Sequence, residues 1–380
     1  MATINPREAY LEAVHHCLVR SKTQTEGIVP EVGIFPVLKL SETPLMLYDI
    51  AGPLLFYLFF NLDKEGKINA SIMTAADSRL PRMIYSVQYG DPGWDKEAVQ
   101  KRAEELARSI LEPGDTFDLR FVCYCFPKIG ALIEIHDKNQ KIKKTSLRDV
   151  GDWTEIPMDQ EGEPTEGQTT YSFIRHLHGQ GLESKNSIQR KTSYLSEMLD
   201  VSSEPKLAEL QRLIKNEVAT LSLAGSQSKI LPVPLVGQET NVWCAVASAQ
   251  MIFEFYGMHH SQSEIAELMH TGASGTTNDD QLAGYHKILG EGFRVLLDEA
   301  SQWQGAREDV DGGFPLKSGI PGHARVCRGW LEVVQTRPDG SSFSDLQLVI
   351  NDPWPKGKGS YREEPWDSVL HTNFIHARKT

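Results

Sequence analysis

Short apolar runs separated by turn residues dominate the first 155 residues and predict an antiparallel sheet. Apolar residues at helical spacing predict one helix from Pro6 to about Arg20 and a longer one from Asp95 to Leu111. The turn residues from 63 to 66 predict a hairpin. Strands are expected at 32–40, 45–62, 67–74, 83–89, 117–126, 129–137 and 141–145. A long helix beside antiparallel strands predicts an α+β domain over residues 1–155.

The pattern changes after this region. From Asp159 to Thr170 the chain is polar and poor in apolar residues, which predicts a mobile linker. Helical patterns follow near 189–199 and 204–223, and the residues Ala224 to Ser228 interrupt them. We therefore expect three segments: a first domain over 1–155, a linker and helical connector over 156–229, and a second domain over 230–380.

The second domain opens with a helix that is apolar on nearly all sides. Between Cys244 and Phe253 there is no charged residue, glycine or proline, and Gly257 is placed to end the helix. Such a helix is buried at the centre of a domain. Cys244 lies at its N-terminus, where unpaired N–H groups and the positive end of the helix dipole favour a thiolate. On this helix alone, the commoner role of cysteine as a small buried core residue is favoured.

Other residues around this helix favour chemistry. Gln238 lies six residues before Cys244, close enough for its amide and the Cys244 N–H to bind one developing oxyanion. His323 opens a predicted strand, and a turn signal at 337–340 precedes a return strand that ends at Asp352. Because His323 and Asp352 are nearly equidistant from this turn, a hairpin brings them together at its open end. Asn351 points to the opposite face of its strand, so Asp352 is the better partner for the imidazole.

Gln-x5-Cys at a helix start, Gly-His opening a hairpin and Asn-Asp-Pro-Trp closing it resemble the papain-like cysteine peptidases, above all their staphopain-like and C39-like branches. The resemblance covers residues 231 to 380. It implies that Cys244 is the nucleophile, His323 the general base and acid, Asp352 the orienting residue and Gln238 the oxyanion-hole residue. Papain itself has Asn where this chain has Asp352, and Asp resembles the C39 form. The resemblance also implies that Trp354 shields the His–Asp pair, and it implies no cofactor.

A weaker resemblance links short pieces of the first domain to the cystatin-like pro-domains of streptopain-like peptidases. The pieces are the segments 47–50, 54–60, 86–89 and 91–94. This resemblance implies a zymogen in which the N-terminal domain is an intramolecular partner of the peptidase. Cleavage between Leu223 and Leu231 would release the peptidase domain.

Composition and charge exclude several classes of partner. The formal net charge of −12 argues against binding to nucleic acid or to an anionic membrane surface. No apolar segment is long enough to span a bilayer, and the N-terminus does not resemble a secretory signal. We therefore predict a cytoplasmic location, with secretion left open. Five scattered cysteines predict thiols, and Cys123-Tyr-Cys125 is interpreted as core packing, because no metal-ligand spacing accompanies it.

These observations together predict a cysteine endopeptidase of α+β fold that acts on a peptide or protein substrate. Three alternatives stay open. One is a dedicated leader-peptide processor, as in the C39 group, although the absence of a transmembrane or ATPase region argues against the usual transporter-linked form. The same triad could transfer an acyl group to an amine, as in a transglutaminase-like enzyme, or the fold could serve an inactive binding protein. The sequence identifies no substrate-binding residue and assigns no metal site.

Overall fold

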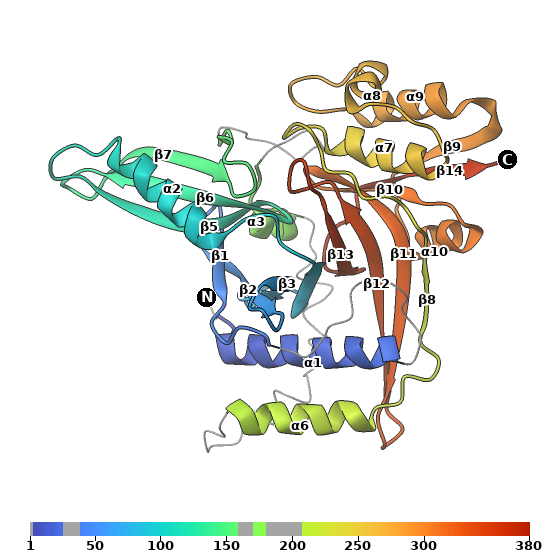
Figure 1. The fold of residues 1–380 in the computed structure, drawn as a ribbon, viewed down its shortest axis with the longest axis horizontal. Helices are drawn as coiled ribbons and strands as arrows, with labels where there is room; N and C mark the ends of the chain where they lie inside the picture. Colours follow the sequence, from blue (N-terminus) through green and yellow to red (C-terminus); the bar gives the residue numbers. More distant parts are fainter. Residues whose placement is uncertain (1–2, 26–38, 159–169, 180–206) are drawn as a thin grey trace.

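The computed structural model describes residues 3–25, 39–158, 170–179 and 207–380. Here the residues up to 158 are called the N-terminal part and those from 227 the C-terminal part. The strands join in one 14-stranded sheet in the described chain, in the order β7-β6-β5-β1-β2-β3-β4-β13-β12-β11-β10-β14-β9, and β8 pairs with β11. Figure 1 shows the strands of the N-terminal part on one side and those of the C-terminal part on the other. The fold is therefore a mixed α/β arrangement built on one large sheet.

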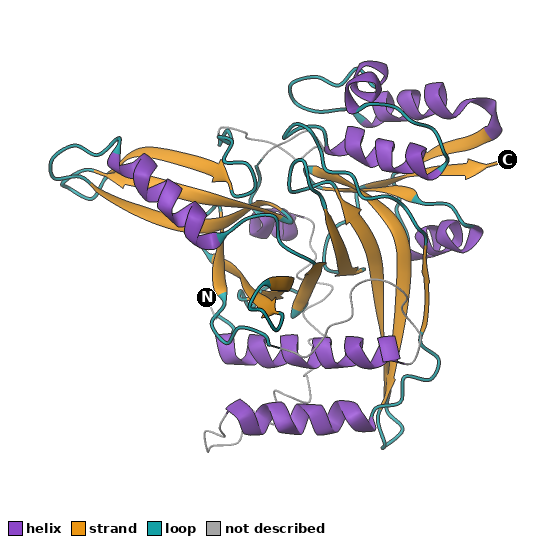
Figure 2. Cartoon of the chain, viewed as in Figure 1, coloured by secondary structure: helices purple, strands orange, loops and turns teal. Residues whose placement is uncertain are grey.

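The N-terminal part contains most of its predicted hairpins. Strand β2 pairs antiparallel with β3, and β5 pairs with β6, which pairs with β7. Figure 2 shows one helix lying along the arm formed by β5, β6 and β7. The elements of this part are α1 (Pro6–Thr25), β1 (Leu45–Asp49), β2 (Leu54–Leu62), β3 (Ile68–Ala75), β4 (Ile84–Tyr89), α2 (Lys96–Arg108), β5 (Thr116–Cys125), β6 (Lys128–His136) and β7 (Ile142–Asp149). Two helices, α3 (Phe173–Gly179) and α6 (Leu207–Thr220), lie between the two parts in the sequence.

Several predictions for this half need correction or cannot be compared. The expected single strand over 45–62 is two strands, because the chain reverses at Gly52, whose φ is 111°, and Pro53 follows it. The predicted helix over 204–223 corresponds to the shorter α6. The predicted strand over 32–40, the linker over 159–170 and the helix over 189–199 lie wholly or mostly outside the described residues.

The C-terminal part places helix α7 on the sheet. Nine of its residues are buried, as the charge-free pattern predicts, and it packs against β11 and against two further helices. The helix ends where Gly257 adopts a φ of 78°. The elements are β8 (Gln227–Ile230), α7 (Cys244–Phe255), α8 (Gln262–Leu268), α9 (Asn278–Leu289), η1 (Gly290–Gly292), β9 (Phe293–Asp298), α10 (Trp303–Gly312), β10 (Leu316–Ile320), β11 (His323–Thr336), β12 (Ser342–Asp352), β13 (Ser360–Pro365) and β14 (Asn373–Lys379).

The two parts meet at the pairing of β4 with β13. In the register of this pair, Gln88 lies opposite Arg362 and Val87 opposite Glu363. Arg20 of α1 forms a doubly hydrogen-bonded ion pair with Glu363, at 2.7 and 2.5 Å, and both side chains are almost completely buried. The hydrophobic core of the N-terminal part also includes residues of β11 and β12. The N-terminal part is thus continuous with the sheet that carries the C-terminal hairpin.

Within the described ranges, the search for a helix long and apolar enough to cross a bilayer finds none.

The Arg20–Glu363 pair provides a test of this junction. Removal of one partner leaves a buried charge without compensation, so we expect Arg20→Met to lower the free energy of unfolding by about 3–5 kcal/mol. Arg108→Met is the matched control, because Arg108 pairs with Glu104 on an exposed helix face. The control should cost less than about 0.5 kcal/mol in urea unfolding. Equal costs in the two variants would show that the buried pair does not hold the parts together.

Candidate active site

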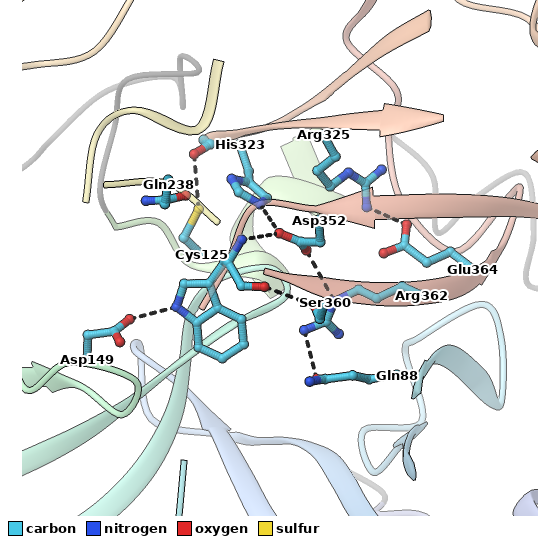
Figure 3. Close-up of polar contacts among 12 residues, drawn as sticks. Gln88, Cys125, Asp149, Gln238, His323, Arg325, Asp352, Ser360, Arg362 and Glu364 are labelled. Carbon is cyan, nitrogen blue, oxygen red and sulfur yellow. Dashed lines mark hydrogen bonds and ion pairs between the residues drawn. The ribbon is translucent and has the colours of Figure 1, made fainter. Parts of the chain in front are cut away.

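The hairpin of β11 and β12 brings His323 and Asp352 together. His323 Nε2 lies 2.8 Å from Asp352 Oδ1, and both side chains are fully buried. The register of the hairpin shifts between Cys327 and Gly329, which changes the pairing toward its open end. These are the two side chains that the sequence analysis expects to meet there. Figure 3 shows the imidazole pointing toward the carboxylate.

Both carboxylate oxygens of Asp352 have polar neighbours. Besides His323, Oδ1 accepts a hydrogen bond from the Trp354 N–H at 2.8 Å. Oδ2 forms an ion pair with Arg362 Nε at 3.1 Å. Asn351 points to the other face of the strand, where its Nδ2 donates to the carbonyls of Val233 and Pro234. Asp352 is therefore the carboxylate that can orient the imidazole.

Cys244 is the first residue of α7, and its side chain is only 2% exposed. It packs against Ala324, the residue that follows His323 on β11. The other ring nitrogen of His323, Nδ1, has no hydrogen-bond partner in the part of the chain that the structure describes. A ring bound to a carboxylate through Nε2 can accept a thiol proton at Nδ1.

Gln238 is held next to the same loop by its backbone. Its N–H donates to the Pro353 carbonyl at 2.9 Å, and its own carbonyl accepts from the Gly357 N–H at 2.8 Å. The preceding Gly237 allows this approach, because a Cβ there would lie 2.2 Å from the Lys358 nitrogen. The Gln238 Nε2 donates to the Thr240 carbonyl at 2.7 Å, and an amide nitrogen carries a second hydrogen.

Burial dominates the electrostatics of the pair. Complete burial lowers the pKa of His323 to about 4, although Asp352 opposes this shift, and Lys128 and Arg325 add to it. Burial alone would raise the pKa of Asp352, but His323 and Arg362 hold it well below its usual range. In this state the imidazole is neutral and the carboxylate is ionised near neutral pH.

The N-terminal part contacts the residues that surround this pair. The Cys125 thiol lies 3.4 Å from the carbonyl of Gly322, next to His323. Trp354 Nε1 donates to Asp149 Oδ2 at 2.9 Å. Lys128 is buried as well. Its burial lowers its pKa, and the neighbouring Cys125, Cys244 and Asp352 raise it more. These contacts cover the site from the side of β5, β6 and β7.

No spacing in the sequence points to these covering residues. The sequence pattern predicts core packing for Cys125, and burial agrees, but its sulfur also faces the loop before His323. Asp149 and Gln88 lie in strands of the other half, so no sequence spacing connects them to the site. The sequence offers only a weak indication, since each is a polar residue near the end of a strand. In the structure both side chains are buried. Burial of unpaired polar groups is costly, so such positions point to distant partners.

Comparisons with known proteins bear on the C-terminal part. Residues 230–377 match the model of the Peptidase_C39 like family. This match indicates a cysteine peptidase in general terms. The search of curated proteins finds no match.

Two solved structures are similar to part of this chain. One is the peptidase domain of Streptococcus ComA, a bifunctional ABC transporter involved in quorum sensing. It is 20% identical, with 39% of this chain and 99% of that chain covered at a TM-score of 0.29. The other is a double glycine motif protease from an AMS/PCAT transporter in complex with the leader peptide. It is 17% identical, with 40% of this chain and 95% of that chain covered at a TM-score of 0.29.

The lowered pKa of His323 predicts how stability depends on pH. The unfolded chain binds a proton near pH 6.5 but the folded chain only near pH 4, so stability falls as the pH drops through this window. His323→Gln should remove about 3 kcal/mol of this loss between pH 7.5 and pH 4. Burial also lowers the pKa of His15, His16 and His371. The unfolding free energies of the unsubstituted protein and of His323→Gln will therefore both depend on pH, and the difference between the two dependences reports on His323. Urea unfolding at several pH values measures it, and identical slopes would contradict the burial of a neutral His323.

Proposed function

We propose that this chain is a cysteine endopeptidase in which Cys244, His323 and Asp352 form a catalytic triad and Gln238 completes the oxyanion hole. The observation that carries the proposal is the buried His323–Asp352 pair. Its second ring nitrogen has no hydrogen-bond partner among the described residues, and the next residue on the strand, Ala324, packs against Cys244 at the start of α7. The family match over residues 230–377 supports the same reaction class.

The proposed reaction runs in two stages. His323 Nδ1 takes the proton of the Cys244 thiol, and the thiolate attacks the carbonyl carbon of a peptide bond. The Cys244 N–H and the side-chain N–H of Gln238 bind the oxyanion. The imidazolium then gives its proton to the departing amine, the C–N bond breaks, and an acyl-enzyme remains. His323 next deprotonates a water, which cleaves the thioester and restores the thiol.

We infer further that the structure represents a closed, zymogen-like state. Gln238, Cys244, His323 and Asp352 are each at most 2% exposed, so a peptide needs the covering residues of the N-terminal part to move. Burial also keeps His323 neutral, and an imidazolium is what stabilises a neighbouring thiolate. Displacement of the cover would admit both substrate and water to the imidazole.

Cleavage of the connector would not by itself separate the two parts. In the expected interval, residues 227–230 form β8 and pair with β11, whereas Ala224 and Gly225 are exposed and accessible to a protease. After a cut there, the β4–β13 pairing and the buried Arg20–Glu363 pair would still join the parts. Activation on this proposal takes two steps, a cut and a displacement.

Labelling with the epoxide inhibitor E-64 tests the nucleophile. Peptide mapping is expected to find modification at Cys244, at a rate that His323→Ala lowers by at least about 10³-fold. Cys17, Cys123, Cys125 and Cys327 are internal controls, because burial raises the pKa of each thiol. Labelling should become faster when limited proteolysis within 224–226 is followed by displacement of the N-terminal part. Equal labelling of Cys244 in the His323→Ala variant would exclude the triad.

Self-processing is tested by incubating the full-length chain and its Cys244→Ala variant side by side. We expect the unsubstituted protein alone to show a shorter band, with its new N-terminus near 224–231, because the cut requires the thiolate. A shift of equal size in Cys244→Ala would assign the cut to another protease.

Product mass spectrometry with and without an added primary amine distinguishes hydrolysis from acyl transfer. Absence of any product in the opened protein would favour an inactive binding fold.

A further inference from the structure

We propose that Arg362 is a positioning residue of the catalytic centre, whose guanidinium holds the far oxygen of Asp352 so that the carboxylate stays charged and aimed at His323. The inference rests on the function proposed above. It adds a fourth residue to the proposed triad of Cys244, His323 and Asp352.

The guanidinium is fixed on several sides. Arg362 is 2% exposed, and its Nε–H donates to Ser360 Oγ at 3.2 Å. The same Nε lies 3.1 Å from Asp352 Oδ2, where the two charges form an ion pair without a hydrogen bond. Its Nη2 donates to Gln88 Oε1 at 3.0 Å, and its Cζ lies 5.7 Å from the centre of the Trp354 ring. Figure 3 shows Asp352, Ser360 and Gln88 grouped around Arg362. A cation held by this many contacts cannot turn away from the carboxylate without losing them.

The sheet register explains why Arg362 faces this carboxylate. Asp352 lies opposite Ser360 in the β12–β13 pair, so Arg362 is two residues further along β13 and on the same face as Ser360. The side chains at 360 and 362 therefore both lie beside Asp352. Ser360 Oγ also donates to the Trp354 carbonyl at 2.9 Å, which ties the loop after Asp352 to the same strand.

The charges around Asp352 single out Arg362 as its cation. Arg325 forms a buried ion pair with Glu364, so its charge is already matched. Lys128 approaches from β6 and is shared with Cys125 and Cys244. Arg362 alone among the described cations is within ion-pair distance of an Asp352 oxygen. Other titratable and charged groups also surround the Asp352–Arg362 ion pair. They are His323, Arg325, Glu364, Lys128, Cys123, Cys125 and Cys244.

Loss of this cation has a predictable electrostatic effect. Burial drives the pKa of Asp352 upward, and His323, Arg362 and the more weakly acting Arg325 hold it down. Without Arg362 the carboxylate becomes protonated at a higher pH, and a neutral carboxyl no longer supports an imidazolium. The thiolate–imidazolium pair then forms only at higher pH.

The experiment measures alkylation of Cys244 by iodoacetamide from pH 4 to pH 9 in the full-length chain, read by peptide mapping. Arg362→Met is expected to move the acid limb of the rate profile upward by about one pH unit. Arg362→Lys restores a cation and should return the limb to within a few tenths of a unit. Arg82→Met is the matched control: it removes an arginine–aspartate pair of the same junction, with Asp345, and should leave the limb in place.

Each outcome decides between the inference and the proposed function. A reactive Cys244 whose acid limb is the same in Arg362→Met would overturn the role of Arg362 and leave the triad intact. A Cys244 that stays unreactive in the unsubstituted chain, even after limited proteolysis and displacement of the N-terminal part, would overturn both. Should Arg362→Met fail to fold, as judged by circular dichroism, Gln88→Met decides instead. It removes one of the bonds that hold the guanidinium, so an upward shift supports the inference and an unchanged limb contradicts it.

Discussion

The buried carboxylate of Asp352 is the charge on which the arrangement of this site depends. A carboxylate without water is costly unless cations and hydrogen-bond donors surround it. Here a ring nitrogen, a backbone N–H and a guanidinium do so, within about 3 Å. These groups come from β11, the loop after β12, and β13. The charge can therefore be accommodated only when all three strands are in register, which couples the catalytic geometry to the fold of the sheet.

The same sheet links the site to the N-terminal part. Strand β13 carries Arg362 toward Asp352 and also pairs with β4. Its neighbouring residue Glu363 is paired with Arg20. One short strand thus places Arg362 beside the Asp352 carboxylate on one face and joins the N-terminal part through Glu363 on the other. A displacement of the cover that also disturbed β13 would alter the charge balance around Asp352.

Burial has two opposite consequences for such a centre. Exclusion of water strengthens the attraction between charges and protects a thiol from solvent. It also lowers the pKa of His323, so that the closed state holds a neutral base. In the buried site the His323–Asp352 pair is therefore formed, but the imidazole carries no proton that could stabilise a thiolate. Asp352 carries a negative charge, whereas an asparagine at this position would provide only a dipole. A buried negative charge needs a compensating cation, and Arg362 lies at ion-pair distance.

Much of the site could be predicted from local rules. The apolar helix after residue 243 follows from its charge-free stretch, and the turn at 337–340 together with the strand pattern places His323 and Asp352 at one end of a hairpin. The alternation of side chains along a strand separated Asp352 from Asn351. Each of these inferences depends on residues close in sequence or on a single turn, where period and register are set by the backbone itself.

The partners from the other half could not be predicted in this way. Gln88, Cys125 and Asp149 meet the site only because β4 pairs with β13 and because the arm of β5, β6 and β7 packs over the loop after Asp352. Pairing between strands more than two hundred residues apart leaves no spacing in the sequence. The sequence by itself determined the candidate nucleophile, base and carboxylate. The tertiary structure decided which cation balances that carboxylate and what covers the thiol, because both depend on long-range packing of buried charges.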